Sequence, residues 1–280
     1  MSNLVIRIAG ALATGTFGFG LLITGAQAAD IDAGCIPAVS TTNAKLEGAG
    51  GYYKDQKSKG GRFQGVASVS LPIGCLLGAQ IDLGGGDVDG TGFFGIGGHL
   101  FTRDPSSYLL GLHAQYIQLG HRDIFRIGPE AELYLDNVTL SGMVGLEDAH
   151  RLRSDNVVAQ IEAAYYISDD FKVYGGFRHF LPVDAGAVGF EFKPESLPGS
   201  IFVDAMAGSE HYVSVMGGLR FEIGATEKTL KARQREDDPG QYFNLLARPA
   251  EPCVPPVGRE VCGQLPKEQT VTFSSNDSVR

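Results

Sequence analysis

Four histidines and five aspartates lie close to predicted turns of this 280-residue chain. They are His121, His150, His179 and His211, together with Asp87, Asp89, Asp123, Asp148 and Asp184. A histidine beside a carboxylate can act as a general base, and the same groups can bind a metal ion. Their spacing matches no metal-binding or nucleophile motif. We therefore predict exposed loop residues, with no metal site and no assigned catalytic residue, and keep an Asp/His hydrolase as the alternative.

A second set of charged residues recurs at alternate positions of apolar-rich segments. Its members are Arg62, Arg126, Glu130, Glu132, Glu162, Lys172, Arg178, Glu191, Arg220 and Glu222. Opposite charges that face a common interior can brace it through ion pairs, or they can line a selective pore. We expect these ten side chains to point into one lumen, and both roles stay open.

These positions belong to twelve segments in which apolar and polar residues alternate, the period of a β-strand that has two different faces. The segments are 44–54, 61–71, 76–86, 91–101, 108–118, 122–135, 138–147, 156–167, 171–180, 184–193, 200–208 and 211–223. Turn-forming residues separate them, for example Asp136-Asn137 and Ser168-Asp169-Asp170. The short connections predict consecutive antiparallel hairpins, with no helical crossovers.

One face of every segment consists of apolar side chains, glycine and tyrosine. In segment 156–167, for example, this face carries Ala159, Ile161 and Tyr165. A soluble sandwich would bury such a face, whereas a transmembrane barrel would turn it towards lipid. The even strand number, strands of about ten residues and aromatic residues near strand ends favour an all-β, antiparallel, up-and-down transmembrane β-barrel of about 12 strands. A soluble exported β-protein is the alternative.

Composition limits the partners. The net charge of -9 argues against nucleic acid, which binds basic surfaces, and no cofactor-binding motif is present in the sequence. Residues 1–28 resemble a secretory signal that is cleaved after the Ala26-Gln27-Ala28 motif. We therefore predict four parts: the signal (1–28), a periplasmic N-terminal segment (29–43), the barrel (44–223) and a periplasmic tail (224–280).

The cysteines and the tail should share one side of the membrane. If both barrel termini face the periplasm, Cys35, Cys75, Cys253 and Cys262 all lie in that oxidising compartment. We predict the disulfides Cys35–Cys75 and Cys253–Cys262, although four cysteines allow three pairings. The tail is expected to form a short helix followed by an irregular Pro-rich stretch. It either contacts peptidoglycan or a periplasmic protein, or serves as a linker.

Three stretches resemble bacterial outer-membrane β-barrels. "YVSVMGGLRFEIG" (212–224) is similar to the final-strand assembly signal of such proteins, although it does not end the chain. "RDPSSYLLGLHAQYI" (103–117) and "RIGPEAELYLDN" (126–137) look like segments of uncharacterised porin-like barrels from alphaproteobacteria. The resemblance implies outer-membrane lipid and the barrel-assembly machinery as partners, and a structural or narrow-pore role without catalysis. The phospholipase type of barrel needs Ser and His on the lipid-facing surface, where this sequence has neither.

Overall fold

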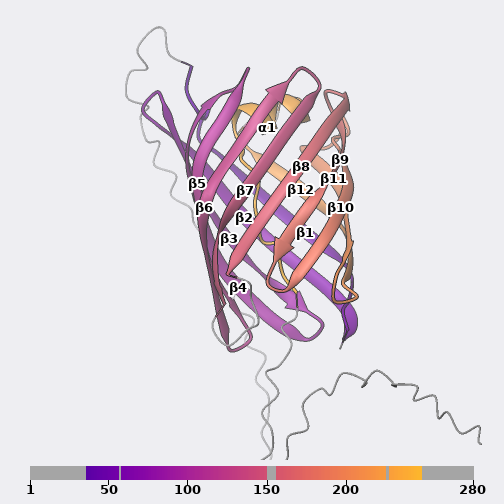
Figure 1. Ribbon diagram of the computed structural model, residues 1–280. Helices are drawn as coiled ribbons and strands as arrows, with labels where there is room; N and C mark the ends of the chain where they lie inside the picture. Colours follow the sequence, from indigo (N-terminus) through magenta and orange to yellow (C-terminus); the bar gives the residue numbers. More distant parts are fainter. Residues whose placement is uncertain (1–35, 57, 150–155, 225–226, 248–280) are drawn as a thin grey trace, which may run out of the picture.

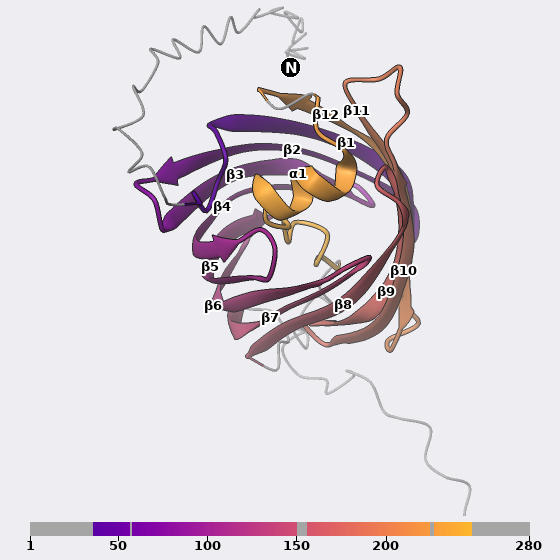
Figure 2. The ribbon, with the colours of Figure 1, turned by 90° about the horizontal axis from the view of Figure 1, so that it is seen from above.

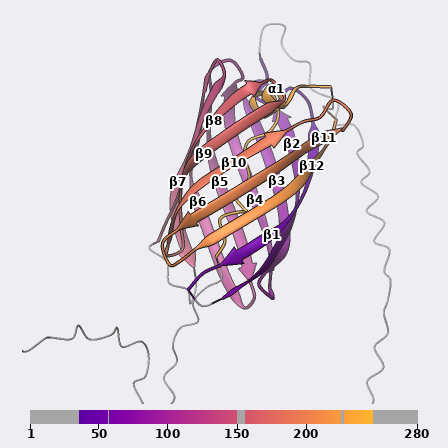
Figure 3. The same ribbon diagram turned by 90° about the vertical axis from the view of Figure 1, so that its right-hand side faces the viewer.

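Twelve antiparallel strands close into a single barrel (Figures 1 and 3). The computed structural model describes residues 36–56, 58–149, 156–224 and 227–247. The strands are β1 (Asn43–Lys54), β2 (Lys59–Ile73), β3 (Leu77–Val88), β4 (Thr91–Asp104), β5 (Tyr108–Leu119), β6 (Arg122–Leu135), β7 (Val138–Ala149), β8 (Val157–Ser168), β9 (Phe171–Phe180), β10 (Val183–Phe192), β11 (Gly199–Gly208) and β12 (Val213–Ile223). The predicted fold class and strand number are confirmed.

The first and last strands close the barrel. β1 pairs with β12 from Ala44↔Ile223 to Lys54↔Val213, and the other ladders join consecutive strands. Closure pairs the backbone of every strand on both sides, which a bilayer requires because it offers no water to unpaired N–H and C=O groups. Tight turns keep the strands adjacent, as where Asp136, with φ +39°, supports the two-residue connection from β6 to β7.

The apolar face of the barrel points outward. Large side chains such as Leu112, Ile161 and Phe177 are 46–65% exposed in the middle of their strands. Such a continuous apolar surface would be strongly unfavourable in water but suits lipid chains. The soluble alternative is therefore wrong, because a sandwich would bury these side chains. The structure is that of a transmembrane β-barrel.

The chain beyond β12 turns back into the barrel. Helix α1 (Leu230–Glu236), N-capped by Thr229, lies inside the mouth formed by the start of β1 and the end of β12 (Figure 2). We call this mouth the α1 end and the opposite mouth the far end. Residues 238–247 then run through the lumen towards the far end (Figure 3). The predicted tail is thus corrected for residues 227–247, which lie within the barrel instead of leaving it. Among the described residues, no helix is long and apolar enough to cross a membrane.

Candidate functional site: the occupied lumen

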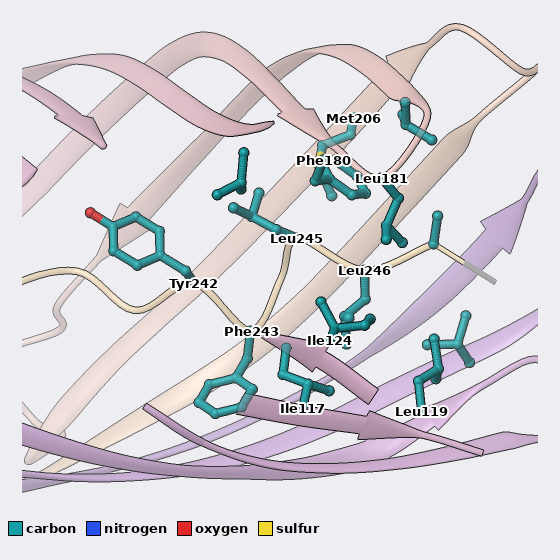
Figure 4. Close-up of a cluster of buried hydrophobic side chains, with 14 of the residues drawn as sticks. Ile117, Leu119, Ile124, Phe180, Leu181, Met206, Tyr242, Phe243, Leu245 and Leu246 are labelled. Atoms are coloured by element: carbon teal, nitrogen blue, oxygen red, sulfur yellow. The ribbon is translucent and has the colours of Figure 1, made fainter. Parts of the chain in front are cut away.

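An apolar cluster closes the far end of the lumen (Figure 4). Leu245 and Leu246 from the inserted segment are fully buried in it. The barrel wall supplies an apolar ring that includes Tyr53, Val88, Leu119, Ile124, Val158, Phe180, Leu181, Met206 and Tyr212. The lumen is therefore not polar throughout: its layer nearest the far end is a small hydrophobic core built around the chain's own C-terminal segment.

Two arginines of the wall hold the main chain of this segment. Arg62 donates to the carbonyl oxygens of Leu246 (3.1 Å), Asn244 (3.0 Å) and Phe243 (3.4 Å). Arg126 donates to the Leu245 carbonyl at 2.8 Å. Four consecutive carbonyls thus have a guanidinium partner. Because a guanidinium carries five N–H donors in a fixed fork, one arginine can serve several acceptors.

Phe243 lies over two glycines. A Cβ atom added to Gly84 of β3 would lie 2.6 Å from the Phe243 ring, and one added to Gly95 of β4 would lie 2.8 Å from it. Any larger residue at either position would occupy the space of the ring. These two glycines therefore form the floor of an aromatic pocket in the wall.

Below this pocket, Tyr242 lies in a buried polar cluster. The two ring nitrogens of His99 lie 3.1 Å from an Asp82 oxygen and 2.9 Å from the Glu130 carboxylate. Tyr242 donates to Glu130 (3.3 Å), stacks on His99 at 5.8 Å between ring centroids, and meets His113 edge-on at 4.6 Å. The arrangement satisfies buried charged groups while fixing the tyrosine, and none of these contacts requires a ligand.

Ion pairs brace the other charged positions. Arg178 contacts Asp204 (2.7 Å) and Glu162 (3.2 Å), and Arg126 contacts Glu147 (2.7 Å) with both side chains fully buried. Towards the α1 end, Arg220 joins Glu47 to Glu191, and Lys172 lies 3.3 Å from Glu191. The pairs link neighbouring or nearby strands, so the wall of the lumen is cross-braced.

Helix α1 is anchored independently at its own mouth. Arg233 of the helix forms an ion pair with Glu222 of β12, and Lys45 of β1 binds Asp238 just beyond the helix at 2.7 Å. The Lys231 amide donates to the Asp169 carbonyl in the β8–β9 turn (2.9 Å). The inserted region is thus fixed at two places, the helix near one mouth and residues 242–247 near the other.

A polar cavity of about 140 Å³ remains between the inserted segment and the wall. Its lining comes mainly from β7–β12, β1 and the segment itself, and includes Lys45, Glu47, Glu162, Lys172, Arg178 and Arg220. A space of this size holds several water molecules. The apolar cluster separates it from the far end.

The predicted lumen charges can now be placed in the structure. All ten predicted lumen charges lie on the inward faces of their strands, with Glu132 accepting a hydrogen bond from Tyr134 (2.8 Å). Glu147, Asp204 and Asp82 also belong to the polar face that the alternation predicts, whereas sequence reasoning left out His99, which stands at an alternating polar position. Sequence reasoning also left out the inserted segment, whose signal is the apolar run "YFNLLA" (242–247) within an otherwise polar tail.

Three of the described rim aspartates have different partners. His179 Nδ1 lies 2.7 Å from Asp184 across the β9–β10 hairpin. Asp123 instead accepts from Tyr116, and Asp87 accepts from the Gly90 amide. Within residues 36–247, apart from the stretches the structure leaves out, no three His, Cys, Asp or Glu side chains could hold a metal ion together.

Several predictions fall on residues that the structure does not describe. His150, the signal segment 1–28, Cys35, Cys253 and Cys262 lie outside the described residues. Cys75 lies in the turn between β2 and β3. Both disulfide pairings stay predictions.

The architecture defines a class of fold: a twelve-stranded transmembrane β-barrel with an occupied lumen. No protein-family model matches the chain, and no curated protein does. Among solved structures it is similar to the "KdgM porin in complex with disordered oligogalacturonate", with 7% identity, 63% of this chain and 98% of that chain covered, and a TM-score of 0.50. A structure described as "Unveiling the Mechanism Behind the in-meso Crystallization of Membrane Proteins" has 14% identity, coverage of 72% and 96%, and a TM-score of 0.51.

A third similar structure is an enzyme, the Salmonella typhi outer membrane phospholipase dimer with bound calcium. Its identity is 9%, its coverage 69% of this chain and 93% of its own, and its TM-score 0.44. At these identities the similarities establish only the barrel fold. The TM-score of 0.44 for the phospholipase is too low to support any argument about this chain.

Proposed function

We propose that this protein is a non-enzymatic outer-membrane barrel that provides a narrow passive pathway, closed in the described state by its own C-terminal segment. The observation that carries the proposal is the charged cavity beside that segment. Side chains of both signs line it, among them Lys45 and Arg220, while the apolar cluster around Leu245 and Leu246 fills the lumen near the far end.

The location of the block makes the proposal testable. Leu245 and Leu246 are fully buried in the apolar layer, so the double change Leu245→Lys/Leu246→Lys introduces charge into the block. Burying an ammonium group there is strongly unfavourable because the nearest charged groups, Arg62 and Arg126, have the same sign, so the segment should leave the layer. We expect the full-length variant to conduct ions in planar lipid bilayers far more often than the unmodified protein.

Leu197→Lys is the matched control, because Leu197 is 40% exposed in the β10–β11 turn and lies outside the lumen. Heat-modifiable migration on SDS gels checks that each variant forms the barrel. Folded variants that conduct no more than the unmodified protein would contradict a pathway and favour the structural role.

A further inference from the structure

The inserted segment is bound to the wall without β-pairing. Every ladder of the described structure joins two of the twelve strands, and residues 241–247 take part in none of them. The segment's amide donors bond locally: Leu245 N to the Tyr242 carbonyl, Leu246 N to the Asn244 carbonyl, and Phe243 N to the Gln241 side chain. Its carbonyls bond to the wall. The contacts therefore resemble those between a bound peptide and a preformed site more than those of a thirteenth strand.

The wall recognises both the main chain and the side chains of the segment. Arg62 and Arg126 bind carbonyl groups, which every peptide has, so they fix its path. Selectivity comes from shape: the floor of Gly84 and Gly95 admits an aromatic ring at 243, and the far-end ring admits two leucines. Tyr212 adds a hydrogen bond to the Leu246 carbonyl at 3.2 Å.

The segment can leave without the helix. α1 and Asp238 have their own partners in β12, β1 and the β8–β9 turn. Pro239 and Gly240 connect the two parts, and no atom lies within 4 Å of a Cβ built on Gly240. β1 and β12 close the barrel without help from the segment. Once the contacts of residues 242–247 with the wall break, a change of backbone angles near Gly240 would therefore let the segment move while the helix stays in place.

We propose that the far-end half of the lumen is a peptide-binding site for a turn-forming aromatic-x-Leu-Leu sequence, and that residues 241–247 occupy it as a reversible internal ligand. The same sequence supplied as a separate peptide binds this site once the internal copy is displaced. The consequence for conduction rests on the function proposed above, whereas the binding itself does not.

Binding is measured in detergent by fluorescence anisotropy, with a labelled peptide "QYFNLLA" and the scrambled peptide "LNAYLQF". The receptor is the full-length Phe243→Lys/Leu246→Lys variant, in which the added ammonium groups lie beside Arg62 and should displace the internal copy. We expect this variant to bind "QYFNLLA" at least about tenfold more tightly than the scrambled peptide. The unmodified protein, whose site is occupied, should bind it more weakly than the variant does.

Adding Arg62→Gln to the variant tests the carbonyl contacts. The loss of charged hydrogen bonds to three carbonyls should weaken binding by about tenfold or more. Equal binding of both peptides by a folded variant would overturn the proposal. If that variant does not form the barrel, Phe243→Ala/Leu246→Ala replaces it, since it removes the internal side chains without adding charge and leaves the wall, including Gly84, unchanged.

A bilayer measurement separates this proposal from the proposed function. In a conducting variant, added "QYFNLLA" should reduce conductance and the scrambled peptide should not. Binding in detergent without any conductance would leave the site standing and overturn the pathway. Conductance without selective peptide binding would leave the pathway standing and overturn the peptide-binding site.

Discussion

The buried pair Arg126–Glu147 offers the sharpest test of how the lumen is held together. Both side chains are 0% exposed. Arg126 reaches Glu147 through Nε at 2.8 Å and Nη2 at 2.7 Å, and Glu147 also accepts from the Leu181 amide at 2.8 Å. Arg126→Met leaves the buried Glu147 carboxylate without its guanidinium partner. Breaking a buried pair in this way destabilises a protein by about 3–5 kcal/mol.

Removing both charges should cost less than removing one. In Arg126→Met/Glu147→Gln, the amide oxygen of glutamine still accepts from Leu181 and no isolated charge remains. We therefore expect the double variant to be more stable than Arg126→Met alone, with strong coupling in the double-mutant cycle. Arg126→Met also removes the bond to the Leu245 carbonyl, a loss that Glu147→Gln does not restore.

The measurement is equilibrium urea unfolding in lipid vesicles. The chain contains no Trp, so the folded fraction is followed by gel migration and circular dichroism rather than by tryptophan fluorescence. Lys59→Met, at an exposed position, is the control and should change the free energy of unfolding by less than about 0.5 kcal/mol. A cost below about 1 kcal/mol for Arg126→Met, or purely additive effects in the cycle, would refute the view that this pair is isolated from water.

Three further outcomes are expected. Gly84→Val should force the Phe243 ring from its pocket and speed chymotrypsin cleavage near residues 242–243. Gly97→Ala is the control, because its Cβ would make only ordinary contacts. Equal cleavage of the two variants would refute the aromatic pocket. Leu112→Arg, on the lipid face in the middle of β5, should destabilise the barrel in vesicles by about 2–4 kcal/mol. Leu197→Arg, in the exposed β10–β11 turn, is the control, and an equal loss of stability in the two variants would argue against lipid contact at Leu112. Peptide mapping without reduction should yield Cys35 linked to Cys75 and Cys253 linked to Cys262, and any other pairing would contradict the prediction made from the sequence.

The faces of the strands were predictable because lipid imposes the same rule on every strand. An outward position such as Ile161 meets hydrocarbon, so a charge there is excluded, while its neighbour Glu162 faces the lumen and pairs with Arg178. Because the alternation recurs in twelve segments, it predicts both the strand number and the inward direction of the charged side chains. The particular partners were not predictable, because pairs such as Arg220–Glu47 join the two ends of the barrel sequence and depend on its closure.

The inserted segment escaped prediction because it carries no periodicity. Residues 241–247 form neither a strand nor a helix, and prolines follow them, so by composition they resemble a linker. One feature of the sequence does indicate burial. Tyr242, Phe243, Leu245 and Leu246 form a dense apolar run in a polar tail, and such a run in water would favour burial by several kcal/mol.

Alternation of polar and apolar residues assigns each residue to the inner or outer face of the barrel. It does not show what fills the lumen at that residue's level along the barrel axis. Lipid does not constrain inward positions, so their polarity reflects whatever fills the interior at that level. Near the far end, inward Leu119, Ile124 and Phe180 are apolar because Leu245 and Leu246 lie against them. One level below, Arg62 and Arg126 face carbonyl oxygens. The inward residues are therefore a complement of the inserted segment, layer by layer. An apolar layer on the inward parity of a barrel sequence, several strands wide, accordingly predicts that protein fills that layer instead of water.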